Sequence, residues 1–550
     1  MPRDGGGFVL RSRMPAPPYE RCLGDFLVRW ARTDRVFLAE RVDGDWRRVT
    51  YAEALSAARG IGQALLDLGL GPRRPLFVLS GNSIAHALLM LGAMHAGVPI
   101  APVSPAYSLM SADYQKLRAM AALLAPGAIF AETRTPFAGA LAALAPTVPV
   151  LDATDVEAMR ATVPGSIDAA FDALTGDTVA KFLFTSGSTG TPKGVINTQR
   201  MLCSNQAMLA VGWPFLTARP PVIVDWLPWS HTFGANHNFN LILMHGGTLY
   251  IDGGKPAPGL FDETLRNLRD VPSTICFNVP RGYDMLVPYL ETDAVLRARF
   301  FEQLDTMFYA AAALSPATWA RLAALTDIPM TSGWGSTETS PLITLVTFPI
   351  DRPRVVGLPV PGVELAFVPS GDLQEMRVRG PNVSPGYLGP NGTIEPLPLD
   401  EQGFYPMGDA GRLTDDGIEF ACRTSENFKL ASGTWAHVGE LRVALIAALA
   451  PHLADAVITG HDRDELGALV FLSPGRAVNN DLRTLFAQHS VSAITSSTRI
   501  ARMIVLDEPP VIDAGEITDK GYLNQRAILA RRSVIVERLY RDDDPDVIRT

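Results

Sequence analysis

The sequence predicts an α/β protein with a large N-terminal domain of α/β layers and a small α+β C-terminal domain. Three textures along its 550 residues support this division. Helical and strand patterns alternate over 50–150 and again over 178–345, which is typical of a mainly parallel sheet. Short strands with many Gly and Pro fill 355–420, which indicates a β-rich subdomain. Helices return after this stretch, so the predicted domains are 1–422 and 423–550.

The first α/β stretch can be assigned element by element. Thr50 to Glu53 resemble a capping box and predict a helix that runs to Leu68. Gly81 to Ser83 cap a second helix. Short apolar runs predict strands at 75–80, 98–103, 128–130 and 148–151. In the C-terminal domain we expect a helix over 439–450, strands over 456–460 and 468–472, and a helix from Asn480.

The longest apolar stretch, 84–103, is too short to cross a membrane. Gly97 and Pro99 end its helix after about 13 residues, whereas a bilayer needs about 20. We therefore expect a buried helix followed by a strand, and no membrane insertion. Residues 1–20 lack the apolar core of a secretory signal.

The composition is that of a globular protein, with 47% hydrophobic and 19% charged residues. The net charge of −9 argues against a nucleic-acid partner, because such surfaces are built on clustered Lys and Arg. Cys22, Cys203, Cys276 and Cys422 lie far apart without metal-ligand spacing, which indicates the reduced thiols of a cytoplasmic enzyme. Both a monomer and a homodimer are compatible with the sequence.

A loop suited to polyphosphate follows an apolar strand that begins at Val179. Its glycines let backbone N–H groups approach phosphate oxygens closely, its hydroxyls add donors, and Lys193 adds a mobile positive charge. It is not a Walker loop, because Gly194 follows Lys193 where Ser or Thr would stand. Taken alone, such a loop could also be a flexible connector. The predicted phosphate-binding residues are Thr185, Ser186, Gly187, Ser188, Thr189, Gly190 and Lys193.

The stretch Thr185–Gly194 resembles the signature loop of the adenylate-forming superfamily, which comprises acyl- and aryl-CoA synthetases, peptide-synthetase adenylation domains and beetle luciferases. Segments similar to three further motifs of the superfamily follow in the expected order, at 225–234, 330–339 and 403–411. The resemblance implies an enzyme that uses ATP and Mg²⁺, with a large N-terminal domain and a small mobile C-terminal domain.

The resemblance also assigns roles to residues of the N-terminal domain. Glu338 would hold Mg²⁺, which prefers one or two carboxylates together with phosphate oxygens. Asp409 would accept hydrogen bonds from the ribose hydroxyls. Ala311 and Ala312 would lie against the adenine, and Arg423 would contact the ribose. The remaining nucleotide-binding residues would be Trp334, Gly335, Ser336 and Thr337. The acyl pocket would contain His231, Phe233, Tyr309, Gly333 and Trp334. Structural roles remain the alternatives: a core histidine, an alanine turn, a loop glutamate and a turn-forming aspartate.

Ala421 to Gly433 resembles the superfamily's domain junction, about which the C-terminal domain turns between the two half-reactions. Cys422 and Ser425 stand where Gly and an Asp or Lys are usual, and Ser425 is the candidate pivot. The resemblance places Gly433, Thr434 and Trp435 along the tunnel for the pantetheine arm of coenzyme A.

The catalytic lysine of the superfamily usually ends a Pro-x-Thr-x-x-Gly-Lys pattern. Here Glu516 occupies that place, and Lys520 follows four residues later. A carboxylate cannot neutralise charge on a pentavalent phosphate, whereas Lys520 can if the loop is longer. We therefore predict that Lys520 is catalytic, with a solvated surface lysine as the alternative.

Three segments, 194–205, 225–231 and 513–525, resemble the feruloyl-CoA synthetase group. That likeness implies activation of ferulate or a related hydroxycinnamic acid, as in phenylpropanoid degradation, with release of AMP and pyrophosphate. Lys520, Lys193 and Mg²⁺ would balance charge, and His231 would act at the acyl site. The sequence leaves open a medium- or long-chain fatty acyl-CoA synthetase, an adenylation unit that charges a carrier protein, a luciferase-like oxidase and a decayed regulator.

Overall fold

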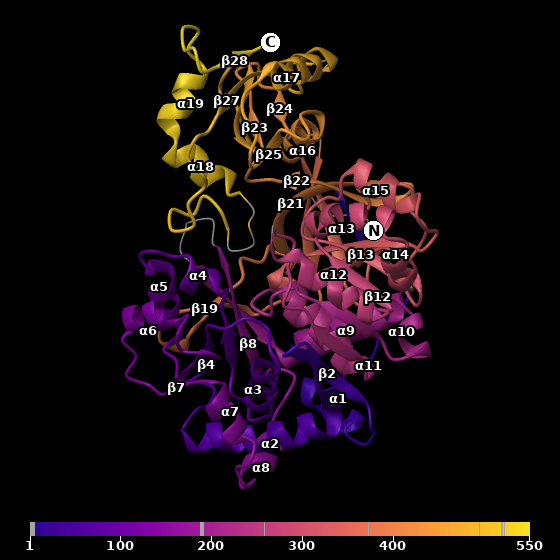
Figure 1. Ribbon diagram of the computed structural model, residues 1–550, viewed down its shortest axis with the longest axis vertical. Helices are drawn as coiled ribbons and strands as arrows, with labels where there is room; N and C mark the ends of the chain where they lie inside the picture. The colour runs from indigo at the N-terminus through magenta and orange to yellow at the C-terminus, as the bar shows by residue number, and fades with distance from the viewer. Residues whose placement is uncertain are drawn as a thin grey trace. The chain divides into compact units, whose positions relative to one another are not determined.

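The computed structural model describes residues 6–186, 192–257, 259–371, 373–493, 495–518, 521 and 523–550 (Figure 1). The chain forms two compact units. The first comprises Met1–Phe367, Arg377–Met407 and Thr414–Glu419, and the second comprises Val368–Met376, Gly408–Leu413 and Phe420–Thr550. The fold is mixed α/β, as the sequence predicts.

An eight-stranded sheet, in the order β20-β19-β9-β8-β5-β4-β6-β7, carries the predicted phosphate loop. β4, β5, β6, β7 and β8 pair in parallel, whereas β9 runs antiparallel to β8 and β19 antiparallel to β9. The bounds are β4 (Leu76–Val78), β5 (Ile100–Pro102), β6 (Ala128–Phe130), β7 (Val150–Leu151), β8 (Val179–Ser186), β9 (Pro192–Thr198), β19 (Gly386–Leu388) and β20 (Ile394–Pro396).

Two smaller sheets also belong to the first unit. One has the order β10-β11-β2-β3 and the other β12-β13-β14-β15-β16. Their strands are β2 (Val36–Val42), β3 (Asp45–Thr50), β10 (Val222–Asp225), β11 (Thr248–Ile251), β12 (Ile275–Asn278), β13 (Thr306–Tyr309), β14 (Met330–Gly335), β15 (Leu342–Leu345) and β16 (Leu358–Pro359).

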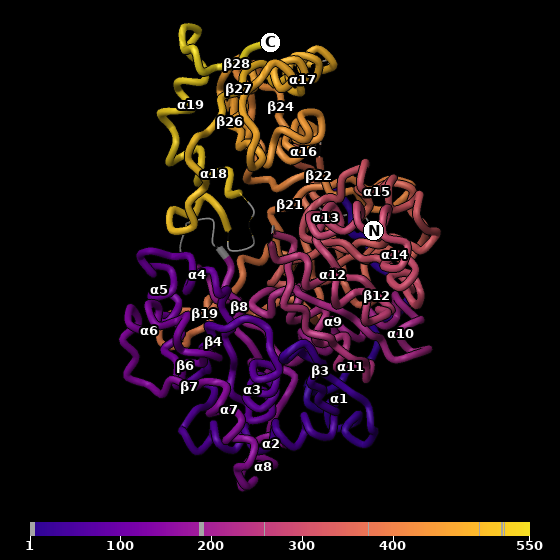
Figure 2. The backbone as a smooth tube through the Cα atoms, viewed as in Figure 1, coloured from indigo at the N-terminus to yellow at the C-terminus, as the bar shows by residue number. Residues whose placement is uncertain are grey.

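Helices cover these sheets (Figures 1 and 2). The helices α2 and α3 approach each other closely where Gly62 faces Gly92. A Cβ at Gly62 would lie 2.9 Å from the Gly92 carbonyl oxygen, so small residues permit the approach. The helices are α1 (Leu23–Trp30), α2 (Tyr51–Asp67), α3 (Ile84–His95), α4 (Ala106–Leu109), α5 (Gln115–Leu124), α6 (Ala138–Leu144), α7 (Ala153–Met159), α8 (Ile167–Asp172), α9 (Gln199–Gly212), α10 (Phe215–Ala218), the π-helix η1 (Phe233–Phe239), α11 (Asn240–His245), α12 (Phe261–Asp270), α13 (Pro280–Thr292), α14 (Ala294–Phe301), α15 (Pro316–Ala323) and the 3₁₀ turns η2 (Thr337–Thr339) and η3 (Pro390–Gly392).

Local signals in the sequence are confirmed here. Thr50 and Glu53 form the predicted reciprocal cap of α2, with Glu53 N–H donating to Thr50 Oγ1 and Thr50 N–H to Glu53 Oε2. Ser83 caps α3, which is buried and is followed by β5. None of the described helices combines the length and apolar character that crossing a membrane requires.

A further sheet has the strand order β1-β17-β18-β21-β22. Its strands lie where the sequence predicts a β-rich stretch, apart from β1 near the N-terminus. The bounds are β1 (Phe8–Arg11), β17 (Glu364–Ser370), β18 (Leu373–Arg379), β21 (Tyr405–Thr414) and β22 (Gly417–Arg423).

The second unit packs helices on both faces of the sheet β25-β26-β27-β28. Alternate residues of a strand face opposite sides, and accordingly Ala456 and Ile458 join one apolar cluster while Val457 joins another. Its remaining elements are β23 (Phe428–Lys429), β24 (Trp435–Ala436), α16 (Val438–Ala448), β25 (Leu453–Thr459), β26 (Leu466–Leu472), α17 (Asn480–Ser492), β27 (Ile500–Val505), α18 (Gln525–Arg531), α19 (Ser533–Leu539) and β28 (Ile548–Arg549).

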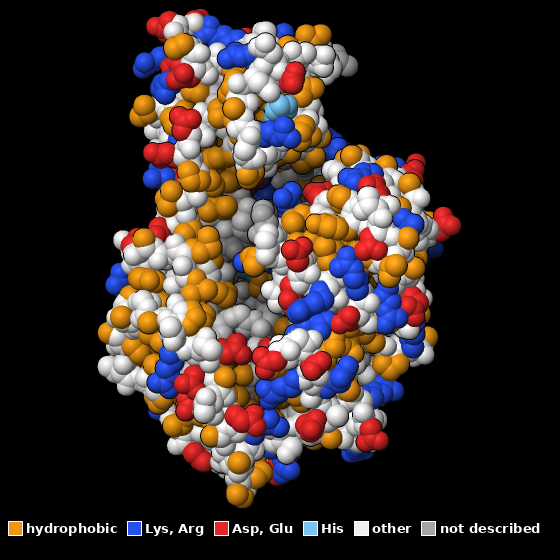
Figure 3. All heavy atoms as spheres, viewed as in Figure 1, with side chains coloured by type: hydrophobic (Ala, Val, Ile, Leu, Met, Phe, Trp, Pro, Cys, Tyr) orange, Lys and Arg blue, Asp and Glu red, His pale blue; other side chains and the backbone are white. Residues whose placement is uncertain are grey.

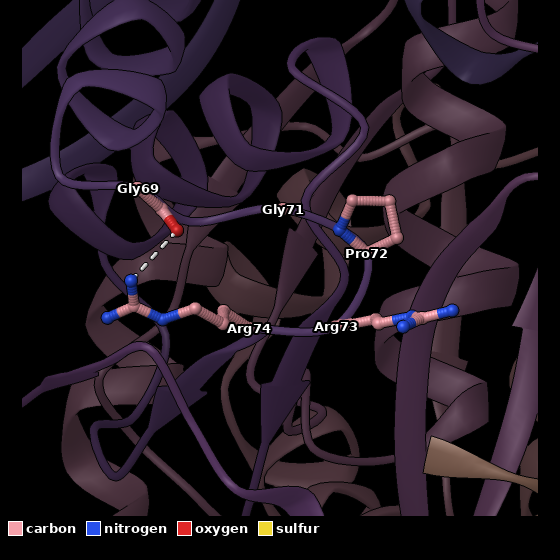
Figure 4. Close-up of a pocket in the computed structure, with 5 residues that line it drawn as sticks. All are labelled: Gly69, Gly71, Pro72, Arg73 and Arg74. Carbon is pink, nitrogen blue, oxygen red and sulfur yellow. Dashed lines mark hydrogen bonds between the residues drawn. The ribbon is translucent and has the colours of Figure 1, made fainter.

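Surface and thiol features agree with the composition. All four cysteines are buried and form no disulfide. On the face drawn in Figure 3, acidic and basic side chains are interspersed over the first unit. A small open hollow lies at the turn after α2, where Arg74 Nη1 donates to the Gly69 carbonyl oxygen at 3.1 Å (Figure 4). None of the predicted site residues lines this hollow.

Candidate active site

Strands β8 and β9 frame the predicted phosphate loop. They pair antiparallel, with Thr185 opposite Lys193. Thr185 is half-buried, and the Lys193 side chain is exposed at the start of β9. The pairing fixes both residues at the base of the loop. The other predicted loop residues, Gly187, Ser188, Thr189 and Gly190, lie outside the described residues, as does the Ser186 side chain.

Tyr387 joins the predicted phosphate-binding cation to the predicted metal carboxylate. Lys193 Nζ lies 4.8 Å from the centroid of the Tyr387 ring. The Tyr387 hydroxyl donates to Glu338 Oε1 at 3.1 Å and lies 3.2 Å from the Tyr405 hydroxyl. Burial, and next the Glu338 charge, raise the pKa of Tyr387 well above its ordinary value. The hydroxyl therefore stays protonated and remains a donor to Glu338.

The backbone around Glu338 is fixed by its neighbours. Strand β14 ends at Gly335, where a Cβ would lie 1.6 Å from the Pro341 carbonyl oxygen, so only glycine fits this turn. Ser384 N–H donates to the Glu338 carbonyl oxygen at 2.8 Å, and Ser384 Oγ donates to the Ile196 carbonyl oxygen at 2.7 Å. One serine thus links Glu338 to β9, the strand that carries Lys193.

The Glu338 carboxylate fits Mg²⁺ that arrives with a nucleotide better than a metal ion that is held by protein side chains alone. Within the described ranges no group of three His, Cys, Asp or Glu side chains could hold a metal ion. Mg²⁺ is usually bound through one or two carboxylates, with phosphate oxygens and water completing its octahedron. Glu338 supplies one carboxylate of this kind.

The predicted adenine segment is a turn after β13. Strands β13 and β14 run parallel, with Tyr309 opposite Ser332, so the turn containing Ala311 leaves the strand next to the one that contains Trp334. Ala311 has φ of 74°, a left-handed conformation that is unfavourable for alanine and that clusters at functional sites. Tyr309 itself is buried, and its hydroxyl donates to the Pro353 carbonyl oxygen at 2.8 Å. Trp334 is also buried.

The aromatic part of the predicted acyl pocket lies at the π-helix η1, a form of helix that is frequent at functional sites. His231 precedes it and is half-buried. Phe233 is its first residue and packs near Phe308, with ring centroids 5.7 Å apart. Both rings, together with Phe277, surround His237, whose centroid lies 5.1–5.7 Å from theirs.

His237 is a candidate functional residue that the sequence reasoning missed. Asn238 donates through Nδ2 to Asp225 Oδ2 at 2.9 Å, which turns Asn238 Oδ1 toward His237 Nδ1, also at 2.9 Å. Nδ1 must then carry the proton, and Nε2 is an acceptor. Burial lowers the pKa of His237 to about 4, so the ring is neutral at pH 7. Nε2 is buried and has no hydrogen-bond partner among the described residues.

The second unit brings the two predicted ribose residues together. Arg423 Nε lies 3.4 Å from Asp409 Oδ1. Arg423 is exposed, whereas the Asp409 side chain is almost fully buried. Gly408, with φ of 70°, forms the turn before Asp409, and its carbonyl oxygen accepts hydrogen bonds from Thr424 N–H and Oγ1. This clamp holds the end of β22 against β21.

The predicted junction and coenzyme A residues form a hairpin. Gly433, with φ of 79°, and Thr434 form its turn, and Trp435 begins β24 with Lys429 Nζ 5.0 Å from its ring. Ser425 is exposed in the preceding turn. Cys422, which replaces the usual glycine, is buried and its thiol accepts from Asn427 Nδ2 at 2.8 Å. Burial raises the Cys422 pKa to about 11, so the group is a thiol and not a thiolate.

Lys520 lies outside the described residues. Glu516 is described, and it is fully buried and paired with Arg532. Sequence reasoning identified Glu516 only as a departure from the expected pattern, since its arginine partner stands sixteen residues further along the chain.

Comparisons with known proteins identify the family of the chain. The family model described as AMP-binding enzyme matches residues 28–388. The probable nonribosomal peptide synthetase CymA of Salinispora arenicola is 29% identical over 479 residues, covering 82% of this chain and 6% of that protein. A long-chain-fatty-acid–CoA ligase of Escherichia coli is 29% identical over 276 residues, covering 47% of this chain and 46% of that protein. The chain thus spans less than half the length of both relatives.

The fold also matches solved structures. The anthranilate CoA ligase AuaEII in complex with anthranoyl-AMP superposes with a TM-score of 0.75 at 18% identity, covering 96% of this chain and 99% of that one. At this identity the likeness concerns the fold.

Proposed function

Because the chain belongs to the AMP-binding enzyme family, we propose that it activates a carboxylic acid as an acyl-adenylate and transfers the acyl group to coenzyme A. The acid's carboxylate attacks the ATP α-phosphate, and pyrophosphate leaves. The thiolate of coenzyme A then attacks the carbonyl carbon of the mixed anhydride, and AMP leaves. Neither step needs a protein nucleophile, because positioning and charge stabilisation suffice.

We assign the charge stabilisation to two lysines and to Mg²⁺ held by a carboxylate. Lys193 neutralises phosphate oxygens from the base of the loop, and Lys520 supplies the second cation. Glu338, oriented by Tyr387, is the protein ligand of Mg²⁺. When bound, Mg²⁺ neutralises charge on the phosphates of the nucleotide. Asp409 accepts hydrogen bonds from the ribose hydroxyls, and Gly433, Thr434 and Trp435 contact the pantetheine arm.

The proposed acid is a 4-hydroxycinnamic acid of the ferulate kind. One observation carries this choice: a neutral imidazole acceptor, His237 Nε2, is buried among Phe233, Phe277 and Phe308 without a partner within the described part of the chain. A phenolic hydroxyl would donate to it, and the flat ring would pack on the aromatics. A fatty acid would leave this acceptor without a hydrogen bond, which costs about 1–3 kcal/mol.

The test compares AMP release in the presence of coenzyme A with ferulate, 3-methoxycinnamate and octanoate. We expect ferulate to exceed 3-methoxycinnamate, which lacks the 4-hydroxyl, by about 10- to 100-fold in kcat/KM. His237→Phe should abolish this preference. His245→Phe is the matched control, because His245 is also a buried histidine but belongs to α11 and lies outside the aromatic cluster. A higher kcat/KM for octanoate would instead identify a fatty acyl-CoA synthetase.

The likeness to a peptide synthetase supports a second candidate, an adenylation unit that charges a carrier protein. Replacing coenzyme A by a holo-carrier protein distinguishes the two. Acyl transfer to coenzyme A and none to the carrier supports the ligase, and the reverse supports the adenylation unit.

A further inference from the structure

The Glu516 carboxylate is the centre of a buried ion pair in the second unit. Its side chain has no solvent exposure, and that of Arg532 is 6% exposed. Arg532 donates through Nε to Oε1 at 2.7 Å and through Nη2 to Oε2 at 2.8 Å. Arg531 Nη1 and Val511 N–H complete the shell around Oε2, at 2.9 and 3.0 Å. This is the bidentate geometry of a strong carboxylate–guanidinium pair.

The same guanidinium fixes the chain that leads to Glu516. Arg532 Nη1 donates to the Glu508 carbonyl oxygen at 2.9 Å, and Nη2 donates to that of Pro509 at 3.1 Å. The Glu516 N–H donates to the Val511 carbonyl oxygen at 3.1 Å. One arginine at the end of α18 therefore holds both ends of the segment 508–516.

A short hairpin projects from this fixed base. Ile517 and Leu523 form an antiparallel bridge, and Asn524 N–H donates to the Glu516 carbonyl oxygen at 2.8 Å. Asn524 then caps α18 by accepting from Ala527 N–H. Gly521 N–H donates to the Thr518 carbonyl oxygen at 2.9 Å, which closes the turn. In the sequence, Asp519 and Lys520 stand between Thr518 and Gly521 and lie outside the described residues.

We propose that the Glu516–Arg532 pair is a positioning element for Lys520: it fixes the described chain that leads into the segment containing this lysine. The proposal rests on the proposed function, because it concerns the adenylation step assigned to Lys520. A carboxylate replaces the usual lysine at 516, and the pair that it forms anchors the chain just before Lys520, which stands four residues later in the sequence. Glu516 and Arg532 act through Lys520 and do not contact the reacting atoms.

Two half-reactions measured on the full chain test the proposal. Adenylation is followed by acid-dependent pyrophosphate exchange, and thioester formation is followed from chemically prepared feruloyl-AMP and coenzyme A. The variants are Glu516→Gln and Arg532→Lys. Asp455→Asn is the matched control, because Arg442 and Asp455 form a bidentate pair at 2.7 and 2.6 Å in the same unit, on α16 and β25.

We expect both variants to lower kcat of adenylation by about 10- to 100-fold, the loss that a misplacement of about 1 Å produces. The KM for ATP and thioester formation from the preformed adenylate should stay within about twofold. Asp455→Asn should leave both half-reactions near wild type. Glu516→Asp, which keeps the charge, should recover part of the lost adenylation.

Three results would overturn the proposal: wild-type adenylation in Glu516→Gln, equal loss in both half-reactions, or the same selective loss in Asp455→Asn. A variant that fails to fold would lose both half-reactions equally, since an unfolded unit performs neither, and it would therefore also overturn the proposal. Failure of the proposed function has a different signature, because wild-type protein would then show no acid-dependent exchange with any acid.

Discussion

Removing one oxygen atom from Tyr387 tests the proposed link between Lys193, the phosphate-binding candidate, and Glu338, the metal-binding candidate. Tyr387→Phe deletes the hydrogen bond to Glu338 at 3.1 Å but keeps the ring beneath Lys193. A hydrogen bond to a charged acceptor contributes about 1.5–3 kcal/mol. Glu338 is only half-buried, so water can replace part of this bond. The hydrogen bond should therefore contribute about 1.5 kcal/mol, which corresponds to about a tenfold change in an equilibrium constant.

The assay is acid-dependent pyrophosphate exchange titrated with Mg²⁺ at fixed ATP. We expect the Mg²⁺ concentration for half-maximal exchange to rise by about tenfold in Tyr387→Phe. Tyr405→Phe is the control, because it removes the hydroxyl that lies 3.2 Å from the Tyr387 hydroxyl and keeps the hydrogen bond from Tyr387 to Glu338. An unchanged titration in Tyr387→Phe, or an equal rise in Tyr405→Phe, would refute the reasoning.

Three predictions concern stability. Burial lowers the pKa of Lys181 from 10.5 to about 7, so the folded state loses a proton that the unfolded chain retains, and at pH 7 this costs up to about 5 kcal/mol of folding stability. Lys181→Met should therefore be more stable than wild type at pH 7. This difference in stability, measured by denaturant unfolding, should shrink as pH rises toward 10.5. Burial would raise the pKa of Glu516, but Arg532 and Val511 lower it to about 2. About 3 kcal/mol of folding stability is therefore present above pH 4.5 and is lost as pH falls toward 2. The difference in stability between wild type and Glu516→Gln should close over that range, and a difference independent of pH would contradict this. Gly335→Ala should lower the melting temperature and adenylation together, because its Cβ would meet the Pro341 carbonyl oxygen; unchanged melting and activity would show that the turn adapts.

Local signals in the sequence predicted the elements that depend on neighbouring residues. The cap at Thr50, the buried helix from Ile84 and the strand before the phosphate loop all follow from composition over a few positions. The resemblance assigned Asp409 and Arg423 to the ribose, which stays a prediction; the structure shows that their side chains lie 3.4 Å apart.

Contacts made through strand pairing could not be predicted in this way. Tyr387 reaches Glu338 and Lys193 because β19 pairs with β9, through Tyr387 and Val195, and no local pattern specifies that pairing. His237 was missed because the sequence around it, with Asn236 and Asn238 on either side, matches no motif that was used to predict the site. Its distinguishing feature is the orientation of Asn238 by Asp225, which is a tertiary contact.

Pyrophosphate exchange into ATP, measured with ferulate and Mg²⁺ but without coenzyme A, tests the central claim most directly. The account predicts exchange that requires the acid and that falls by at least about tenfold in both Lys193→Ala and Glu338→Gln. The account would be contradicted if exchange were absent with every aryl and alkyl acid. It would also be contradicted if either Lys193→Ala or Glu338→Gln left the exchange unchanged.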